Sequence, residues 1–168
     1  PPRSTHFPYT TLFRSGLLAG PAVVSFAASD PDDLDAVYSA GDQFAICFSC
    51  PTNKRPVGTA SAVDALFAFS SAIGAAYAGH WSADGTCCTV TVSNATVAVA
   101  PRVGVLNVTV RSSGQLRNNA STSLASTSAS GRLTGNFGAL PGPSIASIVA
   151  SDAANLDGVV GAGGLVRV

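Results

Sequence analysis

The chain has 168 residues, of which 46% are hydrophobic and only 11% are charged, and its formal net charge is zero. This balance excludes an intrinsically disordered chain, and the scattered basic residues provide no clustered basic face for nucleic acid. No apolar run reaches the ~20 residues of a membrane-spanning helix, so we expect no membrane span. All nine acids are aspartate, which favours turns over helices, so the composition predicts strands and loops.

The first fifteen residues are set apart from the fold. The stretch from Thr5 to Ser15 resembles the translation of a sequencing adapter. Segments left by cloning or processing take no part in a fold, so we expect residues 1–15 to pack against nothing and to be poorly ordered. A genuine aromatic N-terminal arm is the alternative. The chain contains no Met, which fits an internal piece of a longer reading frame.

The segment that begins at Gly16 recurs later in the chain. Residues 16–46 and 138–168 align without a gap at an offset of 122 and are identical at 13 of 31 positions. Ordinary residue usage would give about two or three identities. A fixed period of this kind indicates a repeat array. We therefore expect one complete unit over residues 16–137 and the truncated start of a second unit over residues 138–168.

An acidic segment, SDPDDLD, follows the first expected strand. The second copy keeps an oxygen-bearing side chain at three of its positions, as Asp152, Asn155 and Asp157. Ca²⁺ binds six to eight hard oxygen ligands, often from alternating acidic residues in a loop. The expected calcium ligands are the three residues that recur: Asp30, Asp33 and Asp35. In the alternative interpretation, these side chains only close turns by accepting bonds from nearby backbone N–H groups.

Alternating apolar residues predict half-buried strands. Phe44, Ile46 and Phe48 alternate with smaller residues, and a second alternating run places Leu106, Val108 and Val110 on one face. The dipeptide Asp84-Gly85 predicts a hairpin with a two-residue turn. That turn would pair three residues on the core face with partners across the hairpin: Trp81 with Cys88, Gly79 with Val90, and Tyr77 with Val92.

Two segments fit less regular patterns. Residues 61–78 fit both helical and strand spacing, and we expect a short helical turn over 61–66 that leads into a strand. Ser61 and Asp64 resemble a capping box at the start of that turn. The Ser-rich stretch from Asn119 to Ser130 is expected to be a strand flanked by loops.

The chain has four cysteines, Cys47, Cys50, Cys87 and Cys88, which could form disulfides, bind a metal or remain free thiols. A redox pair would need a βαβ setting, and zinc modules usually bring two separated pairs of ligands, which adjacent Cys87 and Cys88 do not provide. An even count in a secreted domain favours disulfides. Cys50 and Cys88 share the inward phase of their strands, so they form one expected bridge, and Cys47–Cys87 is the matching outer pair. Free buried thiols are the alternative.

Three glycosylation sequons begin at Asn94, Asn107 and Asn119. Asn107 falls on the outward phase of its strand and Asn94 lies at a strand end, where glycans can fit. The sequons give modest support to secretion, although a chain rich in Ser and Thr contains some by chance.

The sequence contains no recognisable set of catalytic residues. His80 is the one histidine outside residues 1–15, it has no partner His or Glu, and the chain has no G-x-S-x-G elbow. We therefore expect no enzyme. Tyr38, Tyr77 and Trp81 could form a platform for stacking sugars, but aromatic residues at alternating strand positions more often belong to a core.

Residues 35–48, DAVYSAGDQFAICF, resemble the start of the tandem immunoglobulin-like β-sandwich repeats of large extracellular and cell-surface proteins. The resemblance rests on a Tyr-x-x-Gly-Asp strand entry with alternating apolar residues, made of Tyr38, Gly41, Asp42, Phe44 and Ile46. It implies an all-β, immunoglobulin-like antiparallel sandwich, in which a Cys50–Cys88 bridge would cross the sheets beside Trp81. The second copy departs from it, with Val160 for Tyr38 and Gly164 for Asp42.

The expected function is that of a non-catalytic structural or adhesive module in an extracellular or cell-surface protein. Its partners would be the neighbouring repeats of the same chain, together with surface glycans or proteins. No cofactor is expected apart from the calcium discussed above. The alternatives are a carbohydrate-binding module, which exposed Trp81 and Tyr77 would favour, and an accessory domain of a secreted hydrolase.

Overall fold

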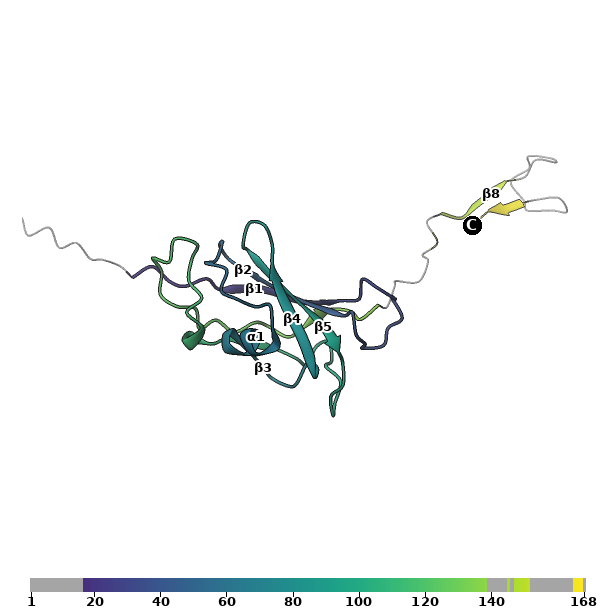
Figure 1. The fold of residues 1–168 in the computed structure, drawn as a ribbon. Coiled ribbons are helices and arrows are strands. Elements are labelled where there is room, and N and C mark those ends of the chain that lie inside the picture. The colour runs from purple at the N-terminus through teal and green to yellow at the C-terminus, as the bar shows by residue number, and fades with distance from the viewer. Residues whose placement is uncertain (1–16, 139–144, 146, 152–164, 168) are drawn as a thin grey trace, which may run out of the picture.

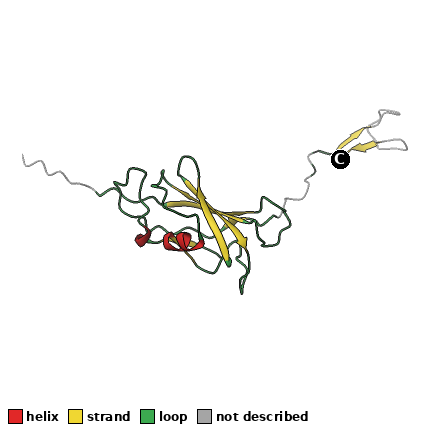
Figure 2. Ribbon diagram, in the orientation of Figure 1, coloured by secondary structure: helices red, strands yellow, loops and turns green. Residues whose placement is uncertain are grey.

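The computed structural model describes residues 17–138, 145, 147–151 and 165–167 (Figure 1). This part of the chain consists mostly of short β-strands, and its one α-helix spans seven residues (Figure 2). The expected all-β class is therefore confirmed. No described helix combines the length and the apolar character that crossing a bilayer requires. The segment 1–15 lies outside the described residues.

Five strands form the larger sheet of the unit, in the order β4-β5-β2-β1-β7. Neighbours among the first four are antiparallel, and β7 runs parallel to β1. The mixed sheet thus contains four antiparallel strands and a very short parallel edge strand. The strands are β1 (Val23–Ser29), β2 (Gln43–Phe48), β4 (Ala76–Trp81), β5 (Cys87–Asn94) and β7 (Thr134–Gly135).

A second layer covers one face of this sheet. It contains helix α1 (Ala60–Leu66), the antiparallel pair β3 (Phe67–Phe69) and β6 (Val108–Val110), and the 3₁₀ helix η1 (Ser112–Gly114) (Figure 1). The expected helical turn that leads into a strand is confirmed by α1 and β3. The expected capping box is wrong, because Thr59 is the N-cap and its side chain accepts a bond from the Ala62 N–H.

The hydrophobic core lies between the two layers. The alternating residues of β2 and β6 point inward as expected, and Phe44, Ile46 and Val108 have no exposed surface. Phe44 lies at the centre of an aromatic cluster, with its ring centroid 5.7 Å from that of Phe137 and 6.0 Å from that of Phe26. Burial of these side chains is the main stabilising contribution to the unit.

The β4–β5 hairpin has the predicted register. The pairs Trp81↔Cys88, Gly79↔Val90 and Tyr77↔Val92 are all present. The connection is longer than expected, because the last bond of the ladder runs from the Ser82 N–H to the Cys87 carbonyl and leaves four residues in the loop. Gly85, at φ +73°, takes the left-handed conformation that this turn requires.

Asp84 holds this loop together through its carboxylate. It accepts bonds from the Ser82 hydroxyl and from both the N–H and the hydroxyl of Thr86. These bonds, that of the Ser82 hydroxyl foremost, lower the pKa of Asp84 to about 2.

Because that pKa is depressed, we expect the loop to be stabilised by ionised Asp84 above pH ~4 and to lose this stabilisation as the pH falls toward 2. Asp84→Ala should remove this part of the pH dependence of unfolding. The measurement is urea denaturation of both chains at steps between pH 7 and pH 2. Parallel stability curves for the two chains would contradict the assignment.

The two edge strands of the larger sheet are β4, which is partly covered by the segment 55–57, and the very short β7. Along the edge of β4, the Gly79 N–H donates to the Val57 carbonyl at 2.6 Å, and the Trp81 indole N–H donates to the Arg55 carbonyl at 2.7 Å. At the opposite edge, β7 has two residues. The segment 55–57 therefore satisfies part of the free edge without forming a regular strand.

The Ser-rich stretch from Asn119 to Ser130 does not form the expected strand. Its one described β-bridge pairs Ala129 with Thr109. Its serine hydroxyls bond backbone groups instead, as where the Ser126 hydroxyl donates to the Pro21 carbonyl and the Ser128 hydroxyl accepts from the Val23 N–H. Side-chain hydroxyls of this kind compete with ladder bonds, which explains the irregular path.

The C-terminal strands β8 (Val149–Ser151) and β9 (Leu165–Arg167) form an antiparallel pair. Their register pairs are Val149↔Arg167, Ala150↔Val166 and Ser151↔Leu165. At the offset of 122 these correspond to the pairs of the β1–β2 hairpin: Ala27↔Ala45, Ala28↔Phe44 and Ser29↔Gln43. The two segments with related sequences therefore pair in the same way.

Candidate functional site

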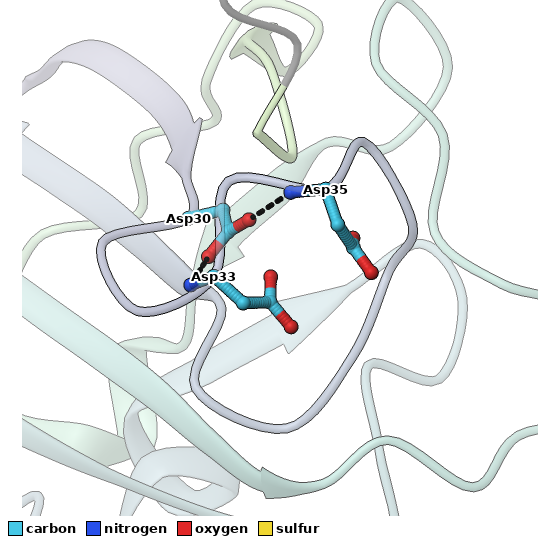
Figure 3. Close-up of side chains that lie close together, drawn as sticks. All are labelled: Asp30, Asp33 and Asp35. Atoms are coloured by element: carbon cyan, nitrogen blue, oxygen red, sulfur yellow. Dashed lines mark hydrogen bonds between the residues drawn. The ribbon is translucent and has the colours of Figure 1, made fainter.

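The long connection between β1 and β2 forms an acidic loop, which we define as residues 30–42. It lies at one end of the unit, opposite the end at which the described chain begins (Figure 1). The structure brings the three expected ligands together, because one carboxylate oxygen from each of Asp30, Asp33 and Asp35 lies within 4.8 Å of the others. Asp30 is buried, whereas Asp33 and Asp35 are exposed. Figure 3 shows the three side chains, all carried by this loop.

Asp30 organises the backbone of the acidic loop. Its Oδ1 accepts bonds from the N–H groups of Asp32 and Asp33, and its Oδ2 accepts from the N–H of Asp35 (Figure 3). The loop is tight enough that Leu34 and Ala36 adopt positive φ angles of 55° and 68°. The turn-closing role that the sequence offered as an alternative is therefore real for Asp30, which still has unused lone pairs.

The carboxylates in the loop influence one another. Burial acts to raise the pKa of Asp30, but hydrogen bonds from Asp33 and Asp32 outweigh it and lower that pKa to about 2. For Asp33 the direction is opposite: its hydrogen bond with the Asp30 side chain and partial desolvation raise its pKa, and the neighbouring carboxylates add to the rise. The ionised form of Asp30 is thus well stabilised, and its charge disfavours ionisation of Asp33.

Asp42, the last residue of the acidic loop, carries a further carboxylate. Asp30 follows Ser29 and Asp42 precedes Gln43, so both lie just beyond the Ser29↔Gln43 pair at the end of the β1–β2 ladder, on opposite strands. Both continue the inward phase of Ala28 and Phe44, and both are buried. Asp42 is fully buried, its Oδ2 accepts from the Ser39 N–H at 2.7 Å, and its Oδ1 has no hydrogen-bond partner.

Burial raises the pKa of Asp42 to about 6, and the charges of Asp30, Asp32 and Asp33 contribute to that rise. The sequence put a functional role for Asp42 in doubt, because the second copy carries Gly164 there. The signal that could have found it was the strand register, which places Asp42 opposite Asp30.

The acidic loop packs against two glycines. The Asp32 carboxylate lies on Gly41, at φ +107°, so closely that a Cβ atom there would collide with it. Gly138, at φ +91°, lies against the Asp30 carboxylate and the Asp35 backbone N–H, and a Cβ atom would not fit there either. The loop is therefore in contact with the backbone at the boundary between the two related segments.

This arrangement offers carboxylate oxygens and no described nitrogen or sulfur ligand, a donor set that suits a hard cation. No family model, curated protein or solved structure matches the chain. The chemical interpretation of the acidic loop therefore rests on its own residues.

The expected outer disulfide is confirmed. Cys47 and Cys87 are register partners in β2 and β5, and they form a disulfide with a Cα–Cα distance of 4.1 Å. The bond joins neighbouring strands of one sheet on its outer face. Structural disulfides persist in oxidising compartments, so this bond indicates an oxidising environment.

The expected Cys50–Cys88 bridge is wrong. Cys88 points inward as predicted, but it is a free, buried thiol whose pKa burial raises to about 12. Cys50 is also free, because β2 ends at Phe48 and the chain then leaves the inward phase. Cys50 instead lines a surface hollow together with Leu18 and Asn119. The immunoglobulin-like bridge across two sheets is therefore absent from the described chain.

The three sequon asparagines lie at different levels of exposure. Asn94 and Asn119 are exposed, and Asn107 is half-buried just before β6. The Asn94 side chain accepts a bond from the Thr96 N–H. Glycosylation at these positions stays a prediction.

The aromatic residues of the expected sugar platform are engaged within the unit. Trp81 is half-buried against Phe48, and the two ring centroids are 5.9 Å apart. Its indole N–H donates a hydrogen bond to the Arg55 backbone carbonyl. The Tyr77 hydroxyl donates to the Asp64 carboxylate, and the Tyr38 hydroxyl donates to the Ile73 carbonyl. The described polar atoms of these rings are thus already satisfied.

Proposed function

We propose that the chain is a non-catalytic structural module of an extracellular or cell-surface protein built from tandem units of this immunoglobulin-like type. The observation that carries the proposal is the shared pairing of β8–β9 and β1–β2 at an offset of 122 residues. Each copy begins with the same hairpin, as expected of a unit that is used repeatedly along one chain.

The placement of the ends and the disulfide support this role. The described part of the unit begins near one end and reaches Gly138 at the other end, beside the acidic loop (Figure 1). Units with this polarity can be joined in series without a change of direction. The Cys47–Cys87 bond suits an oxidising extracellular setting.

The proposal is tested with a chain in which residues 16–137 occur twice before residues 138–168. We expect small-angle scattering to show a maximum dimension longer by about one unit, and thermal unfolding to keep the midpoint of the natural chain. An unchanged maximum dimension would show that the units collapse onto each other and would contradict a spacer role.

A carbohydrate-binding module is the second function that the sequence offers. The Trp81 indole N–H and the Tyr77 hydroxyl already form hydrogen bonds within the unit, which weighs against it. Incubation of the natural chain on an array of surface glycans checks this point. Binding that Trp81→Ala abolishes without unfolding the chain would favour the carbohydrate-binding function over the spacer.

A further inference from the structure

The start of the unit is docked on the body of the unit. The Leu18 carbonyl accepts from the Leu124 N–H at 2.8 Å, and the Pro21 carbonyl accepts from the Ser126 hydroxyl at 2.6 Å. Between these two bonds, Gly20 lies so close to the same segment that a Cβ atom there would be 2.7 Å from the Leu124 carbonyl oxygen. The backbone is therefore part of the folded unit from Leu18 onward.

The second copy keeps the residues of this docked start. Leu140, Gly142 and Pro143 repeat three of its residues at the offset of 122. They lie outside the described residues, but the β8–β9 pairing already repeats that of β1–β2. We therefore expect a complete second unit to dock its start in the same way, from position 140 onward.

The end of the unit is docked as well. Gly138 is buried, and its backbone packs against the Asp30 carboxylate and the Asp35 N–H of the acidic loop. A single position, 139, would then separate the last docked residue of one unit from the first docked residue of the next. Two residue steps span at most about 7 Å. Packed helices and sheets lie about 8–10 Å apart, so two units joined this closely must touch through their side chains.

Three segments meet at the end of the unit where the described chain begins, and backbone hydrogen bonds join them (Figure 1). We define them as the entry face: residues 17–19, 50–54 and 117–124. The face exposes three leucines, Leu17, Leu18 and Leu124, by 47–75%. Its two charged residues, Lys54 and Arg117, are both basic, and their described bonds go to carbonyl and amide oxygens. The entry face is thus apolar and positively charged.

The acidic loop complements the entry face in both respects. Leu34 and Val37 are exposed on it by 46% and 61%. The loop carries five aspartates and no basic residue, and the charges that act on Asp33 and Asp42 come from other carboxylates. Opposite charges favour one orientation of two surfaces over others, and burial of apolar side chains adds to the attraction.

We propose that the acidic loop of each unit forms a fixed contact with the entry face of the next unit in the same chain. Leu34 and Val37 would pack against the exposed leucines, and the aspartates would face Lys54 and Arg117. Exposed ion pairs are weak, so the contact would fix the angle between units with little effect on the unfolding midpoint. The contact rests on the proposed array but goes beyond it, because freely jointed units would also form a spacer.

The test uses the chain with two complete units introduced above, in which Gly16 of the second copy stands where Gly138 stands in the natural chain. Ala78→Cys in each copy places a spin label on an exposed position in the middle of β4. Cys50→Ser in each copy removes the accessible thiol, and Cys88 is buried. We expect pulsed electron paramagnetic resonance to give one narrow distribution of the distance between the two labels.

Leu18→Ser and Lys54→Glu in the second copy should each broaden this distance distribution at least twofold, because they change the surface that meets the acidic loop. The same substitutions in the first copy are the matched controls. The entry face of the first copy has no preceding unit, so the distribution should stay narrow there. Both side chains are exposed in their own unit, so the unfolding midpoint should change little in every variant.

A flexible insert of about six Gly and Ser residues between the copies provides the distribution of freely jointed units. A distribution in the two-unit chain as broad as that of the insert would overturn the contact, and a lengthened maximum dimension in the same chain would leave the spacer role intact. Equal broadening by a substitution in either copy would overturn the assignment of the entry face.

Discussion

Replacement of Phe44 by alanine should lower the free energy of unfolding by about 3–5 kcal/mol. Phe44 has no exposed surface, and its ring lies 5.7–6.3 Å, centroid to centroid, from four aromatic neighbours: Phe26, Tyr38, Phe69 and Phe137. Because these rings come from several segments of the unit, they cannot all move inward to fill the space left by the deleted side chain. The residual cavity adds to the lost transfer free energy.

Urea denaturation followed by tryptophan fluorescence measures this loss, since Trp81 packs against the same core. Val24→Ala is the control, because Val24 is 63% exposed in β1 and its truncation should change the stability by less than about 0.5 kcal/mol. A loss below ~1 kcal/mol for Phe44→Ala would mean that the aromatic cluster is not packed as described.

Loss of the Cys47–Cys87 disulfide should cost about 3–4 kcal/mol. The bond closes a loop with a sequence separation of 40 residues, and in the chain-entropy description its removal frees the unfolded chain by about this amount. We expect the double variant Cys47→Ser, Cys87→Ser to show the loss under oxidising conditions. The natural chain in reductant should show a comparable loss.

Cys50→Ser tests the assignment of the pair. Because Cys50 is a free, half-exposed thiol, its replacement should leave both the stability and the response to reductant unchanged. Peptide mapping under non-reducing conditions should recover one linked pair of peptides, joined through Cys47 and Cys87. Recovery of a Cys50–Cys88 link would refute the arrangement of the sheet described above.

Features set by local pattern could be predicted from the sequence. The register of β4–β5 followed from a turn signal and the alternation of the flanking strands, and the helix before β3 followed from helical spacing. Alternation also identified the buried faces of β2 and β6. In each case the residues that decide the conformation are neighbours in the chain.

Features set by the ends of strands could not be predicted in the same way. The inward phase assigned to Cys50 assumed that β2 continues past Phe48, but the strand ends there. The position of Asp42 across from Asp30 depends on where the partner strand β1 ends. Both questions turn on contacts between distant segments, and a short periodic pattern does not contain that information.

The covered edge of β4 would reduce strand exchange between neighbouring units if many copies are joined in one chain. Neighbouring units joined by a short linker meet at an effective concentration in the millimolar range, far above that of separate molecules. At such concentrations an open strand edge would recruit a strand from the next unit and join the two into one misfolded sheet. The Val57 carbonyl occupies the Gly79 N–H along β4, and Val57 lies so close that a Cβ atom on Gly79 would be 2.9 Å from it. In the tandem array proposed above, the segment 55–57 would leave less of the β4 edge free to pair with a strand of an adjacent copy.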